Sequence, residues 1–123
     1  MECGNFSLSL KVKDIQNSLK FYKSLGFEEV VGDITQNWLV LQNGSARIGL
    51  FQDFLDENML TFNPKWNANK ETIDEMSDVR EIAKTLSDQG IELIEAHLPE
   101  EESSGYFYVL DPDGNKLLFD QHV

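Results

Sequence analysis

Two glutamates, Glu71 and Glu75, are the residues whose type and spacing come nearest to acid–base chemistry. Residues an even number apart point to the same face of a strand, and neighbouring carboxylates raise each other's pKa, as a general base requires. A solvated acidic strand end has the same pattern, and we favour that interpretation. Glu71 is therefore the one candidate catalytic residue, with Tyr106 or Tyr108 as an alternative hydrogen-bond donor. The sequence has no motif for a nucleophilic triad, a phosphate loop or a spaced cysteine cluster.

The composition limits the partners. The chain has 123 residues, of which 41% are hydrophobic and 11% aromatic, and this fits one folded domain. Its formal net charge of −12 argues against nucleic acid, because phosphate binding needs clustered Lys and Arg. We interpret this charge as a source of solubility, and the alternative is that it attracts a cationic ligand. No apolar run is long enough to span a membrane, the polar N-terminus is unlike a signal peptide, and a single cysteine excludes an internal disulfide. We therefore expect an acidic cytoplasmic protein with no nucleic-acid or membrane partner.

A repeated pattern sets the organisation of the chain. Asp14 and Gly26 recur as Asp78 and Gly90 at an offset of 64 residues, and apolar residues at helical spacing lie between them in both copies. The first copy predicts a helix that is capped by Asp14 and ends before Gly26, and the second predicts a helix that is capped by Ser77 or Asp78 and ends before Gly90. The repeat indicates one module used twice, with a pocket where the two copies meet.

Each module is predicted as a strand, a helix and three further strands. Module one, residues 5–52, has its strands at residues 6–12, 27–31, 38–41 and 46–51, with a hairpin turn at Asn43-Gly44. Module two, residues 71–122, has its strands at residues 71–76, 91–96, 106–110 and 116–121. The register of residues 71–76 is left open by one residue, because Asp74 falls on the face that should be apolar.

The connecting segment, residues 53–70, is longer than an ordinary connection. Its middle, residues 59–66, is too apolar for a free linker. It is interpreted as an edge strand, as a flap over the pocket, or as a segment that packs against the protein's own core. We favour the last of these.

Four short motifs form a recognisable combination: Val12-Lys13-Asp14 before the first helix, Phe21-Tyr22 within it, Leu25-Gly26-Phe27 after it, and Asp111-Pro112-Asp113-Gly114-Asn115-Lys116 as the closing turn. Together they resemble the vicinal oxygen chelate superfamily, which includes glyoxalase I, bleomycin resistance proteins and extradiol dioxygenases. The resemblance covers residues 6–121. It implies a single α+β domain, residues 1–123, in which two βαβββ modules form a cupped, barrel-like mixed sheet with helices on its outer face.

The resemblance also implies where a metal ion would be held. Metal enzymes of this group take one ligand from the first strand and one from the last strand of each module, usually His or Glu. The corresponding positions are Ser7, Gly49, Leu118 and, at the 64-residue offset, Glu71. Only Glu71 is a strong ligand, whereas a divalent site needs several such groups, so we expect no metal and no other cofactor. The other possible ligands are expected to be exposed or near a terminus: His97, His122 and Cys3.

Strand alternation and the large aromatic residues give the expected lining of the pocket. Such a lining combines apolar walls with a few polar groups, as small-molecule sites do. The expected ligand-binding residues are Ser7, Ser9, Trp38, Arg47, Phe51, Phe62, Glu71, Ile73, Tyr106, Tyr108 and Leu118. In the alternative, the aromatic side chains fill the cup as core residues.

Two functions remain. We favour a metal-independent small-molecule-binding protein of the glyoxalase and bleomycin resistance type, whose aromatic side chains stack on flat rings or attract a cation. The alternative is an enzyme of the group, either a lactoylglutathione lyase-like isomerase or lyase or a dioxygenase, with a degenerate or displaced metal site. The resemblance further implies a homodimer. The sequence leaves open whether the modules pair within a chain or between chains.

Overall fold

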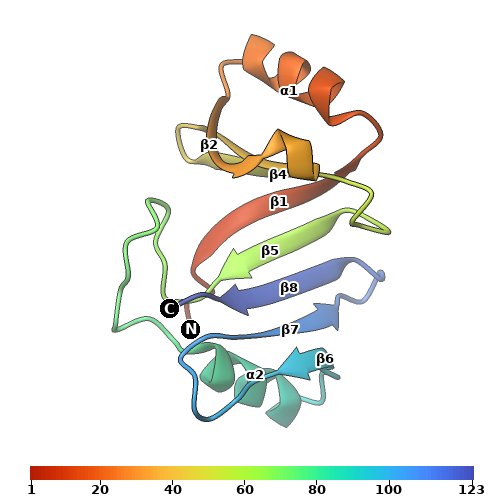
Figure 1. Ribbon diagram of the computed structural model, residues 1–123. Coiled ribbons are helices and arrows are strands. Elements are labelled where there is room, and N and C mark those ends of the chain that lie inside the picture. Colours follow the sequence, from red (N-terminus) through yellow and green to blue (C-terminus); the bar gives the residue numbers. More distant parts are fainter. The chain divides into compact units, whose positions relative to one another are not determined.

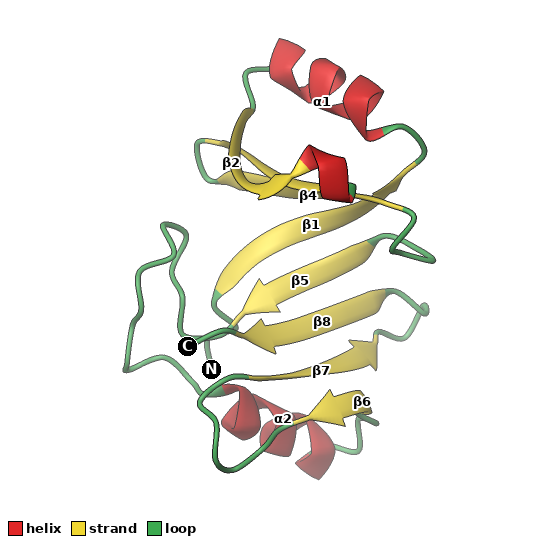
Figure 2. Cartoon of the chain, viewed as in Figure 1, coloured by secondary structure: helices red, strands yellow, loops and turns green.

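The structure, a computed structural model, describes residues 1–123 and has an α+β fold. The chain divides into two compact units. Unit 1 comprises Met1–Phe6 and Leu60–Val123, and unit 2 comprises Ser7–Met59. Each unit holds one α-helix and one group of strands (Figures 1 and 2). Neither helix combines the length and the apolar character that crossing a membrane requires.

Unit 2 carries module one. Its elements are β1 (Asn5–Val12, whose first two residues belong to unit 1), α1 (Ile15–Ser24), β2 (Glu28–Asp33), a single 3-10 turn (Ile34–Gln36), β3 (Trp38–Asn43) and β4 (Ala46–Gln52). The strands follow the order β2-β3-β4-β1. β3 is antiparallel to both neighbours, whereas β1 is parallel to β4. A parallel pair needs a long crossover, which α1, β2 and β3 supply. The predicted hairpin turn joins β3 to β4, and Gly44 adopts there a φ of 59°.

Unit 1 carries module two. Its elements are β5 (Met59–Asn63, whose first residue belongs to unit 2), α2 (Val79–Asp88), β6 (Ile94–His97), β7 (Gly105–Leu110) and β8 (Lys116–Gln121). The strands follow the order β5-β8-β7-β6, and β7 is antiparallel to both neighbours (Figure 1). Both modules therefore have the order βαβββ, and the predicted fold class is confirmed.

The first strand of module two was predicted in the wrong place. Residues 71–76 form turns with a single bridge between Trp66 and Thr72, and β5 at Met59–Asn63 takes the place of the strand. The physical reason is the lack of an apolar face, because Glu71, Asp74 and Glu75 are all exposed. Residues 59–63 form the strand β5, and Phe62 packs against the core of unit 1, so the favoured interpretation of residues 59–66, a segment that packs against the protein's own core, is confirmed. Module two consequently has a long loop, residues 64–78, between its first strand and its helix.

The predicted helix repeat is confirmed in its hydrogen bonds. The Asp14 carboxylate caps α1 by accepting from the N–H groups of Gln16 and Asn17, and the Asp78 carboxylate caps α2 by accepting from the Arg80 N–H. Beyond the C-terminal ends, Gly26 and Gly90 adopt positive φ angles of 97° and 85°. The two helices thus begin and end at equivalent positions, 64 residues apart in the sequence.

Each unit has its own hydrophobic core between its helix and one face of its sheet. In unit 2 the buried residues are Ile15, Leu39, Leu41 and Leu50. In unit 1 they are Val79, Ile82, Ala83, Phe107, Val109 and Phe119. Because side chains alternate along a strand, the neighbouring residues of each sheet lie on the face that the helix does not cover. We call this the helix-free face of the unit.

Candidate functional site

The helix-free face of unit 2 carries most of the predicted binding residues of module one. It is formed by Ser7, Ser9, Trp38, Gln42, Arg47, Gly49 and Phe51, which alternate with the core residues of β1, β3 and β4. Trp38 pairs with Phe51 across β3 and β4, and Gln42 pairs with Arg47. Ser7, Ser9 and Arg47 are buried. The face therefore combines an aromatic pair with hydroxyl groups and one guanidinium.

Arg47 is the charged group of this face. Its Nη2 donates to Oε1 of Gln42 at 2.7 Å, and only 8% of the residue is exposed. Burial lowers the pKa of the Arg47 guanidinium from its ordinary value. A guanidinium stays protonated in proteins even so, and it offers several donors in one plane. Arg47 therefore holds the side-chain carbonyl of Gln42 and is largely shielded from solvent.

Gly49 is covered by an aromatic ring of its own strand. A Cβ atom placed on Gly49 would lie 2.6 Å from Cε2 of Phe51, which is closer than such atoms approach one another. Gly49 is the position on β4 where the resemblance puts a metal ligand. It has no side chain, and the Phe51 ring occupies the space that a ligand side chain would need.

The helix-free face of unit 1 is aromatic and acidic. Tyr106 and Tyr108 of β7 pair with Asp120 and Leu118 of β8, and on the other side with His97 and Ile94 of β6. The two tyrosine rings meet edge to face with centroids 6.2 Å apart, and the His97 ring lies 5.6 Å from Tyr106. The sequence-predicted residues Tyr106, Tyr108 and Leu118 are thus brought together on one face.

Tyr108 has the clearest electrostatic setting on this face. Burial raises the pKa of its phenol, and the nearby charges of Glu95 and Asp120 raise it further. The phenol therefore stays neutral and keeps its proton as a hydrogen-bond donor. The ammonium group of Lys116 lies 4.5 Å from the centroid of the Tyr108 ring, which is a cation–π contact. Tyr108 thus combines a donor hydroxyl with a ring face that attracts positive charge.

A second aromatic group lies at the end of β8. The His122 ring stacks on Trp66 with centroids 4.9 Å apart, and its Nε2 lies 3.1 Å from Oδ2 of Asp120. The hydrogen bond to Asp120 is the main cause that raises the pKa of His122. Lys70 lies 4.9 Å from the Trp66 ring. This stack could not be predicted, because Trp66 belongs to the long loop and His122 lies beyond the last strand.

Three predicted binding residues lie elsewhere. Phe62 packs in the core of unit 1, stacked on Phe119 with centroids 5.3 Å apart, because its side of β5 faces α2. Glu71 is exposed in the long loop, where its carboxylate accepts from Nδ2 of Asn67 at 3.1 Å. Ile73 lies in the same loop, half-buried. Glu71 and Glu75 are both exposed and lie in no strand, so the expected strand face that they would share does not form. Glu95, which influences Tyr108, was missed because it lies where the register of β6 shifts.

The side chains at the expected ligand positions do not fit a divalent metal ion of the kind that the resemblance implies. No group of three or more His, Cys, Asp and Glu side chains is arranged to hold one. The positions implied by the resemblance offer a hydroxyl at Ser7, no side chain at Gly49 and a hydrocarbon at Leu118. On β5, the residues that alternate with Phe62 are Thr61, Asn63 and Met59, none of them a His or a carboxylate.

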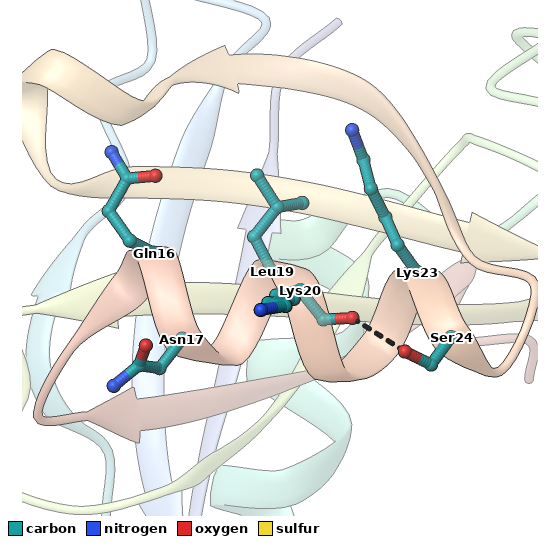
Figure 3. Close-up of a pocket in the computed structure, with 6 residues that line it drawn as sticks. All are labelled: Gln16, Asn17, Leu19, Lys20, Lys23 and Ser24. Atoms are coloured by element: carbon teal, nitrogen blue, oxygen red, sulfur yellow. Dashed lines mark hydrogen bonds between the residues drawn. The ribbon is translucent and has the colours of Figure 1, made fainter.

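A hollow of about 610 Å³ lies along α1 and is lined by that helix alone (Figure 3). Its residues are Gln16, Asn17, Leu19, Lys20, Lys23 and Ser24. The Ser24 hydroxyl donates to the Lys20 carbonyl, and Lys23 forms an ion pair with Glu29. The lining contains no carboxylate and none of the predicted site residues.

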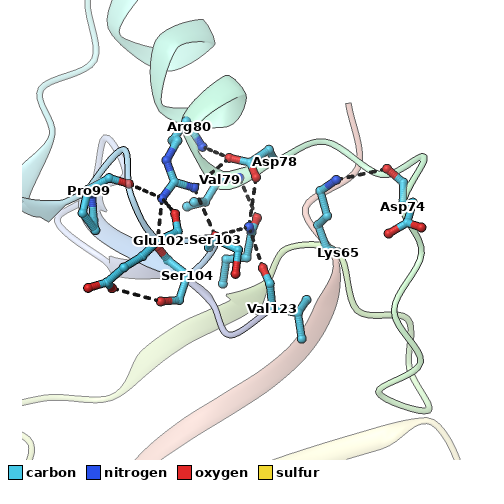
Figure 4. A network of polar contacts seen from close by, with 11 residues as sticks. Lys65, Asp74, Asp78, Val79, Arg80, Pro99, Glu102, Ser103, Ser104 and Val123 are labelled. Atoms are coloured by element: carbon cyan, nitrogen blue, oxygen red, sulfur yellow. Dashed lines mark hydrogen bonds and ion pairs between the residues drawn. The ribbon is translucent and has the colours of Figure 1, made fainter.

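A polar network fixes one end of the sheet of unit 1 (Figure 4). The Arg80 guanidinium donates to the carbonyls of Pro99, Glu102, Ser103 and Ser104 and to the Asp78 carboxylate. Burial acts to raise the pKa of Asp78, but hydrogen bonds from Gln121 and Arg80 outweigh it and hold the pKa below its ordinary value. The network joins α2, the loop before β7 and the end of β8, so its role is to position the strands.

The comparisons with known proteins agree with this architecture. A crystal structure of a glyoxalase/bleomycin resistance protein/dioxygenase superfamily member from Vibrio splendidus 12B01 is 17% identical, with a TM-score of 0.67, and covers 95% of this chain and 97% of that one. The structure titled NAD-dependent benzaldehyde dehydrogenase from Legionella pneumophila is 20% identical, with a TM-score of 0.67 and coverages of 96% and 99%. Methylmalonyl-CoA epimerase from Mycobacterium tuberculosis is 15% identical, with a TM-score of 0.63 and coverages of 97% and 88%. At these identities the likeness shows the fold alone. No curated protein matches the sequence.

The fold and its helix-free faces define a duplicated βαβββ protein. The family model described as Glyoxalase/Bleomycin resistance protein/Dioxygenase superfamily matches residues 6–119, and the chain therefore belongs to this superfamily. The resemblance read from the sequence motifs is confirmed. The superfamily covers several activities, so the function must be argued from the site.

Proposed function

We propose that this chain is a small-molecule-binding member of the superfamily that holds its ligand without a metal ion. The proposal rests on the residues that occupy the positions where the metal enzymes of the family have their metal ligands. Gly49 has no side chain and lies under the Phe51 ring, and Leu118 offers only a hydrocarbon beside Tyr108. Both positions have become apolar or aromatic surface, and such surface suits the body of an organic ligand.

The ligand we propose is aromatic or cationic. On the helix-free face of unit 1, Tyr106 and Tyr108 place two aromatic rings edge to face, and Asp120 and Glu95 supply negative charge near Tyr108. Lys116 over the Tyr108 ring supports the idea that this ring accepts a cation. A cation placed over a tyrosine ring contributes about 0.5 kcal/mol at an exposed site and about 2 kcal/mol or more when desolvated. The net charge of −12 adds long-range attraction.

The first test measures binding of benzyltrimethylammonium and of benzoate by isothermal titration calorimetry. We expect the cation to bind more tightly than the anion. Tyr108→Leu should weaken binding of the cation by roughly threefold to thirtyfold, as expected from the loss of about 0.5 to 2 kcal/mol. Phe21→Leu is the matched control, because Phe21 is an aromatic residue of α1 that is 58% exposed and far along the chain from β7. Equal losses in both variants would contradict the proposal.

The second test asks about the metal. Elemental analysis of untagged protein, followed by thermal-shift titration with Zn²⁺, Ni²⁺, Mn²⁺ and Fe²⁺, should find no stoichiometric ion and no large stabilisation. A ligand present at a hundred times its Kd stabilises a protein by about 2.7 kcal/mol, which is readily detected. Tight binding of one ion per chain that survives His122→Gln would overturn metal independence.

A further inference from the structure

Unit 1 has a hollow of about 540 Å³ next to the C-terminal end of α2. Most of its lining is hydrocarbon and comes from α2, the residues after it and the strands β6 to β8: Leu86, Ile91, Ile94, Val109, Leu110 and Leu117. Leu86 and Leu117 also pack against the core of unit 1, so the hollow lies where the core reaches the surface. Ile91 is 37% exposed and Leu110 is 49% exposed, which leaves apolar surface open to solvent.

The internal repeat explains why this hollow exists. At the offset of 64 residues, Leu86 and Ile91 correspond to Tyr22 and Phe27 of module one. The backbone is the same in both copies: the Phe27 N–H donates to the Tyr22 carbonyl at 3.1 Å, and the Ile91 N–H donates to the Leu86 carbonyl at 3.0 Å. In module one the two rings meet edge to face with centroids 5.6 Å apart. Module two has smaller aliphatic side chains at these two positions.

The polar groups of the lining are acidic. Glu92 and Asp111 belong to it, and no Lys, Arg or His does. The Asp111 carboxylate is fixed, because it accepts from the N–H groups of Asp113 and Asn115 and from Nδ2 of Asn115 at 2.7 Å. These hydrogen bonds also lower the pKa of Asp111, so the group stays ionised at neutral pH. The hollow thus places a fixed negative charge beside an apolar surface.

We propose that this hollow is a second binding site, which takes a small amphiphile with a hydrocarbon body and one ammonium group. The hydrocarbon body fills the space in module two that corresponds to the rings of Tyr22 and Phe27 in module one, and the ammonium group lies near Asp111 and Glu92. The lining includes Leu86, Val109 and Leu117, which pack in the core between α2 and the sheet, and the proposal is independent of any ligand that binds at Tyr106 and Tyr108.

The test uses octyltrimethylammonium, octanoate and octanol below their micellar or solubility limits as probes, with the amide signals of the whole chain followed by ¹⁵N NMR. We expect octyltrimethylammonium to shift the signals of Leu86, Ile91 and Leu117, and octanoate to leave them unchanged. Equal shifts with octanoate would overturn the proposal. So would shifts confined to Tyr106 and Tyr108, or no shift with any probe.

Two variants sharpen the result. Ile91→Phe restores the ring that module one has at Phe27 and should abolish the shifts, whereas Leu25→Phe adds the same ring at an exposed position of module one and should not. Glu92→Gln keeps the hollow. It should weaken the binding of octyltrimethylammonium by about threefold, as the loss of one exposed charge implies, without changing the binding of octanol. Because Glu92→Gln changes no buried side chain, it tests the proposal even if Ile91→Phe does not fold. Unchanged affinity for the ammonium probe in Glu92→Gln would contradict the proposed charge recognition.

Discussion

Two glutamines hold equivalent places in the two modules, and their replacement should have unequal effects. Oε1 of Gln52 accepts from the N–H of Ile15 at 2.9 Å, and Oε1 of Gln121 accepts from the N–H of Val79 at 2.8 Å. Each glutamine ends the last strand of its module and binds the first residue of its helix. Gln121 is only 1% exposed, however, whereas Gln52 is half-buried.

The magnitude follows from the partners that each variant leaves behind. Nε2 of Gln121 also lies within hydrogen-bonding distance of Asp78 Oδ2, the Ser103 carbonyl and the Val123 carbonyl. Gln121→Leu leaves the fully buried N–H of Val79 unsatisfied, at about 1 to 3 kcal/mol, and loses further bonds of about 1 kcal/mol each. We expect a destabilisation of about 3 to 5 kcal/mol for Gln121→Leu and of about 1 to 2 kcal/mol for Gln52→Leu, where water reaches the site more easily.

Urea unfolding followed by circular dichroism checks this difference. With a slope of roughly 1 to 3 kcal/mol per molar, typical of a small protein, Gln121→Leu should lower the midpoint by about 2 M and Gln52→Leu by less than half as much. Trp38 reports on unit 2 and Trp66 on unit 1, so their fluorescence shows which unit the loss affects. Equal midpoints for the two variants would refute the reasoning from burial.

Three further changes test other parts of the structure. Because hydrogen bonds from Gln121 and Arg80 hold the pKa of Asp78 below its ordinary value, its contribution to stability is present above the ordinary pKa and is lost as the pH falls through the folded pKa. Asp78→Asn should therefore flatten the fall of the urea midpoint in acid, and an unchanged slope would contradict this. Gly49→Ala should destabilise by about 1 to 3 kcal/mol in urea, because its Cβ meets the Phe51 ring, and the loss should shrink in a Phe51→Leu background; a loss that persists there would exclude the ring as its cause. The pKa of His122, followed by NMR, should lie above its ordinary value of 6.5 and should fall in Asp120→Asn. The contact between His122 and Asp120 then stabilises the folded state below pH 6.5, and this stabilisation is lost as the pH rises through the folded pKa. A His122 pKa that is unchanged in Asp120→Asn would contradict the pairing of the two side chains.

The parts of the fold that depend on local chemistry could be predicted from the sequence. Asp14 and Asp78 cap their helices, and Gly26 and Gly90 end them, because each signal acts within one turn of chain. The turn at Asp111 is of the same kind, since its carboxylate accepts from N–H groups two and four residues further along.

The first strand of module two could not be placed in this way. The 64-residue offset holds for the helices, and extending it to the strand put Glu71 where Ser7 stands in module one. The long loop between β5 and α2 breaks the offset, and nothing within that loop reveals its length. The error then spread to the site: Phe62 was expected at the pocket rim, and only the position of β5 shows that it faces the core.

The binding faces were predicted in part. Strand alternation correctly grouped Tyr106 and Tyr108 with Leu118, because β7 and β8 form a regular antiparallel pair. It could not include Glu95, since alternation fails where a register shifts and Glu95 adopts a φ of 49°. The contact between Gly49 and the Phe51 ring depends on how the side chain packs, and a single sequence does not reveal this.

The Arg80 side chain determines which substitutions the loop before β7 tolerates. That loop carries three successive glutamates, Glu100 to Glu102, which repel one another, and a single guanidinium gathers its carbonyl groups around one point. Lysine has neither the plane nor the number of donors to take over this task. We therefore expect substitutions of exposed residues in the loop to be tolerated better than replacement of Arg80, which holds the loop in place.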